Sequence, residues 1–214
     1  MKKVIRNNKG FTLLEIIVVL AVLGALAAML SPVVFRYIDD ANRARAQADV
    51  SAISDAINGM YRDTGRWAYY ADGSGSGTGP IAWATGDADF LTSNDSCASA
   101  STDLATCDTT IPDVAGATGF VTNTKTNSLS NELMENGPVF ATTGNRSWRG
   151  PYLQTLPPYD PWGRSYLVNI KDTTTGEAVL VVSAGQDGIV QTSANQAGAS
   201  NAAASGDDIV ARIK

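Results

Sequence analysis

Few side chains in this sequence could carry out catalysis. The 214 residues contain no histidine, which excludes Ser/His and Cys/His nucleophilic pairs, His-ligated zinc and a histidine pH switch. Two acidic pairs, Asp39 with Asp40 and Asp207 with Asp208, could in principle transfer protons. Nothing in the sequence assembles a pocket around either pair. We therefore expect a protein that is not an enzyme.

Net charge limits the possible partners of the chain, and length limits its number of domains. The chain has 16 Lys and Arg against 21 Asp and Glu, a formal net charge of −5, and its basic residues form no stripe over the body of the sequence. A dedicated nucleic-acid binder needs clustered Lys and Arg to displace counterions, so we expect no nucleic-acid partner. The length allows one modest domain, or one domain with an appendage.

The N-terminal segment has the charge pattern of a membrane anchor. The first ten residues carry four basic side chains and no acid, whereas residues 11–35 carry one charge, Glu15. About 20 apolar residues span the hydrocarbon layer of a bilayer. Basic residues before the span place the N-terminus in the cytoplasm and the rest of the chain outside. The apolar run continues into helical sequence without the small-residue cleavage site of a secretory signal.

The junction between the basic and apolar segments carries a recognisable motif. The sequence Lys9-Gly10-Phe11-Thr12-Leu13-Leu14-Glu15 resembles the cleavage motif of type IV prepilins and type II secretion pseudopilins. The resemblance implies that residues 1–10 are a leader and that a prepilin peptidase cuts between Gly10 and Phe11. It also implies that the peptidase methylates the new amino group of Phe11.

Three residues of the apolar helix match positions with assembly roles in that superfamily. The resemblance implies that Glu15 pairs with the N-terminal ammonium of a neighbouring subunit, because an unpaired carboxylate in hydrocarbon costs about 3 kcal/mol or more. The helix macrodipole also favours an acid there, and both explanations stay open. Gly24 and Pro32 fall where related filaments have a helix segment that can unwind on assembly. Ordinary tolerance of Gly and Pro in membrane helices is the alternative.

Residues 36–64 continue the same helix as an amphipathic segment. Val50, Ile53, Ile57 and Met60 follow the spacing of one helix face, and Gly65 is a suitable C-terminal stop. The sequence thus predicts one helix over residues 11–64, with its first half in lipid and its second half against a globular head.

Residues 65–149 form a variable insertion rich in Gly, Ser and Thr. Its run over residues 72–80 lacks the Lys-Ser/Thr of a phosphate loop and predicts a flexible surface loop. Residues 129–135 predict a short helix. Cys97 and Cys107 favour a disulfide in an oxidising compartment, because metal or redox chemistry would need partners that the sequence lacks. Six apolar residues are expected to anchor the insertion to the head: Trp83, Phe90, Leu91, Leu129, Leu133 and Met134.

Residues 150–214 predict a β-sheet head. Two alternating runs, residues 165–170 and 177–184, indicate a hairpin. The order of a Gly-Pro-Tyr-Leu segment, an Asp-Pro-Trp-Gly turn, the hairpin, an Asp-Gly and a final Asp-Asp-Ile resembles the head of the G-type major pseudopilin of type II secretion systems. The fold class we expect is α+β: a long N-terminal helix packed on a small C-terminal antiparallel sheet, with a large loop insertion.

The same resemblance implies a calcium site. In that family the C-terminal loop binds Ca²⁺, and Asp187, Asp207 and Asp208 match its acidic ligands. Hard oxygen donors of this kind suit Ca²⁺. Asp-Gly as a simple turn and Asp-Asp as a solvated pair are the alternative. The stretch over residues 191–205 departs from the family pattern by its length.

The resemblance implies a structural subunit of a pseudopilus that assembles from the inner membrane and drives type II protein secretion. Its implied partners are further copies of itself in a helical homopolymer, minor pseudopilins, the prepilin peptidase, the inner-membrane assembly platform and the membrane. The implied location is a single pass through the bacterial inner membrane, with the N-terminus cytoplasmic and the head periplasmic. A type IV pilus subunit, major or minor, is the alternative, and a membrane-anchored binding domain that never polymerises is the second.

Overall fold

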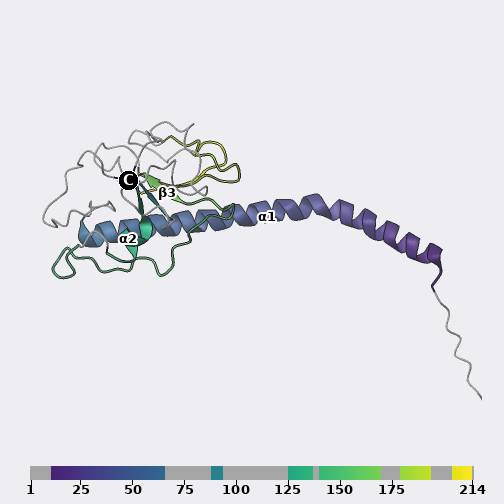
Figure 1. Cartoon of the computed structure of the whole chain (residues 1–214), viewed down its shortest axis with the longest axis horizontal. Helices are drawn as coiled ribbons and strands as arrows, with labels where there is room; N and C mark the ends of the chain where they lie inside the picture. The colour runs from purple at the N-terminus through teal and green to yellow at the C-terminus, as the bar shows by residue number, and fades with distance from the viewer. Residues whose placement is uncertain are drawn as a thin grey trace, which may run out of the picture. The chain divides into compact units, whose positions relative to one another are not determined.

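The computed structural model describes residues 11–65, 88–93, 125–136, 140–169, 179–193 and 204–213 (Figure 1). The chain divides into two compact units, Met1–Ala41 and Asn42–Lys214. The first unit contains the N-terminal part of one long helix. The second contains the rest of that helix and a β-sheet.

Helix α1 spans Leu13–Thr64 and has a defined cap at each end. The Thr12 hydroxyl accepts a hydrogen bond from the amide of Glu15 at 3.2 Å, which satisfies one amide of the first turn. The predicted helix therefore starts two residues later than Phe11, because Thr12 is its cap. At the other end Gly65 has φ +70° and donates to the Tyr61 carbonyl at 2.7 Å. The predicted stop at Gly65 is confirmed.

The C-terminal half of α1 carries one face of the core. Its buried apolar residues recur at helical spacing, so the predicted amphipathic face is confirmed. Thr64, at the last position of the helix, turns its hydroxyl back onto the Met60 carbonyl at 2.7 Å. The buried apolar residues of this face are Ala46, Val50, Ile53, Ala56, Ile57 and Met60.

Five strands form one sheet in the second unit, in the order β2-β1-β3-β4-β5. The four strands β1, β3, β4 and β5 pair antiparallel, and β2 runs parallel to β1 at one edge. The predicted hairpin is confirmed as β3 and β4, with Leu167 opposite Val182. The strands are β1 Ala88–Thr92, β2 Lys125–Ser128, β3 Leu167–Asn169, β4 Leu180–Ser183 and β5 Ile209–Arg212.

The α+β fold class is confirmed, and the insertion contributes more to it than the sequence indicated. Strands β1 and β2 and the short helix α2, Leu129–Leu133, all come from residues 65–149. The strands are five and four residues long, and polar turn-forming residues surround them in the sequence, which hides their alternation. The short helix was predicted, and Ser128 caps it by accepting from the Ser130 amide at 3.1 Å.

The core lies between the sheet and the C-terminal half of α1, and Figure 1 shows α2 and β3 beside that helix. Of the predicted anchors of the insertion, Leu91, Leu129 and Leu133 are fully buried and Met134 packs against the core. Trp83 and the side chain of Phe90 lie outside the described part of the chain.

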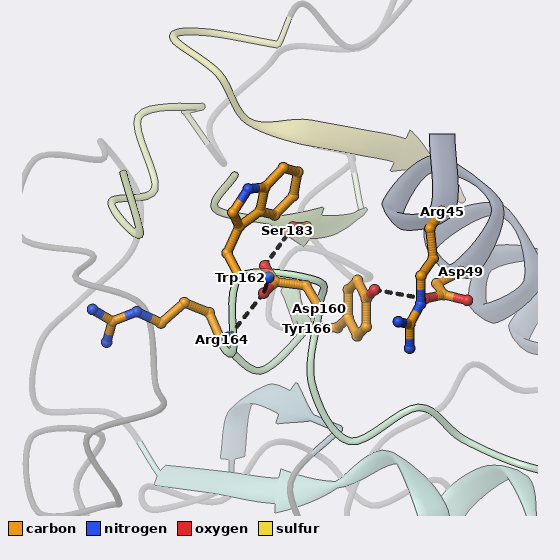
Figure 2. Close-up of polar contacts among 7 residues, drawn as sticks. All are labelled: Arg45, Asp49, Asp160, Trp162, Arg164, Tyr166 and Ser183. Atoms are coloured by element: carbon orange, nitrogen blue, oxygen red, sulfur yellow. Dashed lines mark hydrogen bonds and ion pairs between the residues drawn. The ribbon is translucent and has the colours of Figure 1, made fainter. Parts of the chain in front are cut away.

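One polar contact joins the sheet to the helix through this core. The buried Tyr166, next to β3, donates its hydroxyl hydrogen to Asp49 of α1 at 2.8 Å, as Figure 2 shows. Arg45 lies one turn earlier on α1, with its Nε 3.8 Å from the same carboxylate. Burial, and next the hydrogen bond to Asp49, raise the pKa of Tyr166 well above its ordinary value of 10.0.

We predict that Tyr166→Phe lowers the free energy of unfolding by about 1.5 kcal/mol, because a hydrogen bond to a charged group is lost. Urea unfolding of the full chain in detergent micelles measures the loss. A double-mutant cycle with Asp49→Asn measures the coupling free energy between Tyr166 and Asp49. Tyr159→Phe, at a more exposed site, is the matched control. Equal effects of the Tyr166 and Tyr159 substitutions would contradict the prediction.

The raised pKa of Tyr166 also gives this prediction a pH dependence. The folded state favours the protonated phenol, so its contribution is fully present below pH 10.0, the unfolded pKa, and is lost as the pH rises above it. The difference in stability between wild type and Tyr166→Phe should therefore shrink in alkaline buffer.

Candidate functional site

The first candidate site is the apolar half of α1. The large apolar side chains between residues 11 and 38 are each 48% to 79% exposed. By length and composition this is one helix able to cross a bilayer, and none of its most apolar window is buried. Glu15 lies exposed in its first turn, and it takes part in neither the Arg45–Asp49 nor the Arg62–Asp63 ion pair.

Gly24 and Pro32 lie inside this part of the helix. The helix runs through both positions without interruption, and a Cβ at Gly24 would meet nothing within 4 Å. Proline has no amide hydrogen, so one backbone hydrogen bond of the ladder is missing at Pro32. The idea that this segment unwinds on assembly therefore stays a prediction.

Gly10, Cys97 and Cys107 lie outside the residues that the structure describes. The predicted cleavage point and the predicted disulfide consequently stay predictions. Phe11, the predicted site of methylation, is described and is 79% exposed.

The second candidate site is the acidic loop, by which we mean the described residues 184–193 and 204–208 between β4 and β5. Asp160 fixes where that loop starts. The Asp160 carboxylate accepts from the amides of Trp162 at 3.0 Å and Arg164 at 2.8 Å through Oδ1. Its Oδ2 accepts from the hydroxyl of Ser183, the last residue of β4, at 2.7 Å. Figure 2 shows the carboxylate between the turn and Ser183. Asp160 is 4% exposed, so these donors replace water around a buried charge.

This role of Asp160 was not predicted from the sequence, where the Asp-Pro-Trp-Gly turn served only as part of a resemblance. An aspartate at the start of a turn is nevertheless a known signal for side-chain capping of the following amides. The contact with Ser183 joins residues 23 positions apart, which no local pattern reveals.

Asp207 holds the first half of the acidic loop. Its Oδ2 accepts from the amides of Gln186 at 2.6 Å and Asp187 at 3.2 Å. Gly185, with φ +67°, precedes them, and a Cβ there would collide with Asp207. Glycine is therefore required for the two acidic segments to approach each other.

Asp208 holds the second half of the loop. It is 6% exposed, and its Oδ2 accepts from the amides of Gln191 at 2.8 Å and Thr192 at 2.6 Å. The other carboxylate oxygens, Oδ1 of Asp207 and Oδ1 of Asp208, are buried and have no hydrogen-bond donor. Burial raises the pKa of Asp208, contacts with Thr192 and Gln191 oppose the rise, and the charge of Asp207 adds to it.

The predicted calcium ligands are only partly brought together. Two buried oxygens without donors, from adjacent residues, are the kind of acceptor that a hard divalent cation satisfies. The Asp187 carboxylate is instead occupied by the Ile189 amide at 2.8 Å and the Gln191 side-chain Nε2 at 2.7 Å. Accordingly, the described residues contain no group of three acidic, His or Cys side chains placed to hold a metal. Gln191 was not predicted as part of the site. In the sequence it is only the first residue of the stretch over residues 191–205.

We predict that Asp160→Ala lowers the free energy of unfolding by about 3 kcal/mol, because buried donors lose their acceptor. Asp160→Asn keeps one acceptor oxygen, and the Ser183 hydroxyl can reorient to accept, so its loss should be about 1 kcal/mol. Tryptophan fluorescence during urea unfolding measures both. Asp55→Ala, at an exposed position of α1, is the control. If Asp55→Ala lowered the free energy of unfolding as much as Asp160→Ala, the anchoring role would be refuted.

Two family models match separate parts of the chain. The model of the prokaryotic N-terminal methylation motif matches residues 5–31, which include the start and much of the apolar half of α1. The model of type II secretion system (T2SS), protein G matches residues 126–202. The second match covers β2 from residue 126, β3, β4 and residues 184–193 of the acidic loop, and it ends before Asp207.

Three curated relatives carry the same description, type II secretion system core protein G. The Pseudomonas aeruginosa protein is 44% identical over 57 residues, covering 27% of this chain and 39% of the relative. The Klebsiella michiganensis protein is 34% identical over 62 residues, covering 29% and 44%. The Dickeya chrysanthemi protein is 32% identical over 71 residues, covering 33% and 46%. The chain thus spans less than half the length of the curated relatives it matches.

No solved structure gives a significant match to the chain. The methylation motif lies on the exposed apolar half of α1, and the protein G model lies on strands β2, β3 and β4 of the sheet. Over these parts the chain is similar to proteins with an N-terminal methylation motif and to protein G of type II secretion systems.

Proposed function

We propose that the chain is a structural subunit of a pseudopilus, a filament that assembles from the inner membrane and drives type II protein secretion. The observation that carries the proposal is an apolar helix surface, exposed from residue 11 to residue 38, that coincides with a methylation motif. A surface of this size needs hydrocarbon or other helices around it. A subunit that moves from a bilayer into a filament provides both in turn.

Maturation follows from the same segment. A prepilin peptidase cuts between Gly10 and Phe11 and methylates the Phe11 amino group. Thr12 already caps α1, so the helix begins within two residues of the new N-terminus. The cut would remove the four basic residues of the leader and leave a more acidic mature chain.

Assembly then depends on Glu15. The carboxylate lies one helical turn from the mature N-terminus, on a surface that is otherwise apolar. In a bundle of such helices, the ammonium group of a neighbouring subunit is the opposite charge that offsets its burial, and only one register brings the two together. Further copies of the chain are therefore the main partners, with minor pseudopilins and the inner-membrane assembly platform at the ends of the filament.

The proposed topology is a single pass with a cytoplasmic N-terminus and a periplasmic head. A type IV pilus subunit would share the helix and the processing. The match of the head to the protein G model favours the secretion pseudopilus. A non-polymerising anchor would leave the position of Glu15 without a use.

We predict that Glu15→Gln abolishes filament formation while cleavage before Phe11 still occurs, because the charge pair is lost and the peptidase motif is otherwise intact. Mass spectrometry of the mature N-terminus measures cleavage and methylation, and electron microscopy measures filaments. Asp39→Asn, on the same helix beyond the most apolar part, is the matched control. Normal filaments from Glu15→Gln, or none from Asp39→Asn, would argue against register by charge pairing.

We further propose that the acidic loop binds Ca²⁺ through Asp207 and Asp208, with Asp187 as the third acidic residue. The two buried oxygens without donors support this, since a divalent cation would offset their charge. Backbone carbonyls of the loop would complete the oxygen ligands. A bound cation would tie β5 to the end of β4, and so stabilise one edge of the sheet in the periplasm.

We predict that Ca²⁺ raises the melting temperature of the wild-type full chain in detergent, and that Asp207→Asn with Asp208→Asn abolishes this rise. The substitutions remove the charge that attracts the cation but keep the shape of the side chains. Differential scanning calorimetry with Ca²⁺ or with EGTA measures the shift. Asp55→Asn should behave as wild type, and a wild-type melting temperature that is the same in both buffers would exclude the site.

A further inference from the structure

Gln191 bridges the two acidic segments of the loop. Its side-chain Nε2 donates to Asp187 Oδ2 at 2.7 Å, and its backbone amide donates to Asp208 Oδ2 at 2.8 Å. Its carboxamide also fills the space above Gly206, where a Cβ would overlap with it. The side chain is thus built into the contact between the two segments, although residue 191 is exposed.

The three acidic side chains of the loop differ in which of their oxygens have donors. Asp187 has one oxygen bound to the Ile189 amide and the other bound to Gln191. The free oxygens belong to Asp207 and Asp208. The Asp187 amide contacts Asp207 at 3.2 Å, so its backbone is already beside the pair while its carboxylate is held elsewhere.

We propose that Gln191 is a latch that competes with a divalent cation for the Asp187 carboxylate and so sets the calcium affinity of the loop. The inference rests on the proposed calcium site. The carboxamide NH₂ presents hydrogens to a carboxylate that a cation would otherwise neutralise. Recruiting Asp187 to a cation on Asp207 and Asp208 requires this bond to break, and a ligand binds more weakly when its binding-competent state is less populated.

The latch also explains why Asp187 stands apart from the other two carboxylates. Asp207 and Asp208 are adjacent in the chain, and like charges held close together are unfavourable. Bringing a third carboxylate to them without a cation would be unfavourable. Gln191 satisfies Asp187 in the cation-free loop and gives it a place away from the pair.

Gln191→Leu tests the latch, and Gln186→Leu is the matched control. Gln186 is an exposed glutamine of the same loop that uses its backbone amide to contact Asp207. Full-length protein in detergent is stripped with EGTA, returned to buffer and titrated with CaCl₂ in a calorimeter. We expect Gln191→Leu to bind Ca²⁺ with a Kd about fivefold lower than wild type, since one charge-assisted hydrogen bond no longer opposes binding. Gln186→Leu should leave the Kd unchanged.

Thermal unfolding separates a latch from general damage to the loop. Gln191→Leu should lower the melting temperature in EGTA, where the latch bond exists, and not at saturating Ca²⁺, where it is broken. An equal loss in both buffers contradicts the latch. Gln191→Glu serves as a second variant: it replaces the donor with another carboxylate, which repels Asp187 without cation and should tighten Ca²⁺ binding further.

The outcomes distinguish the latch from the calcium site itself. If wild type binds Ca²⁺ and Gln191→Leu binds it equally or more weakly, the latch is wrong and the site stands. Tighter binding by Gln191→Leu supports both. If neither wild type nor the Gln191 variants bind Ca²⁺, the site and the latch are both overturned.

Discussion

The rest of the structure depends on one constraint: the two halves of helix α1 are apolar in different ways, one half with a buried face and the other exposed. The face of α1 from Ala46 to Met60 is buried against the sheet, while the apolar residues from 11 to 38 are exposed within the chain. Burial of apolar area is the dominant favourable contribution to folding and to most association. The second half of the helix therefore contributes to the core of the head, and the first half leaves a large apolar surface without cover within the chain.

The features that could be predicted from sequence are those that a short repeat of apolar residues or a single turn-forming residue marks locally. Val50, Ile53 and Met60 repeat on one helix face, Gly65 marks a stop, and the hairpin alternates along its strands. Strands β1 and β2 were not predicted, because they are short and their partners lie far along the chain. Leu91 of β1, for example, pairs with Val168 of β3, and no local pattern encodes that register.

The polar contacts also divide into those that the sequence indicated and those that depend on partners far along the chain. The family resemblance pointed to Asp207 and Asp208, and the structure gives each of them one buried carboxylate oxygen without a hydrogen-bond donor. The positions of Asp160 and Tyr166 depend on contacts with Ser183 and Asp49, which are distant in sequence. Gln191 carried no signal of its own, because its importance comes from the glycine opposite it and from the acidic side chain it contacts. Long-range geometry, rather than composition, decides which of several similar polar residues matters.

The strand order gives the head two independent edges. The strands drawn from the insertion, β2 and β1, form one side of the sheet, and β4 and β5, which flank the acidic loop, form the other, with β3 between them. The strands that come from the insertion therefore do not border the acidic loop. We expect changes in residues 65–149 to alter the β2 side of the sheet while leaving the pairing of β4 with β5 unchanged.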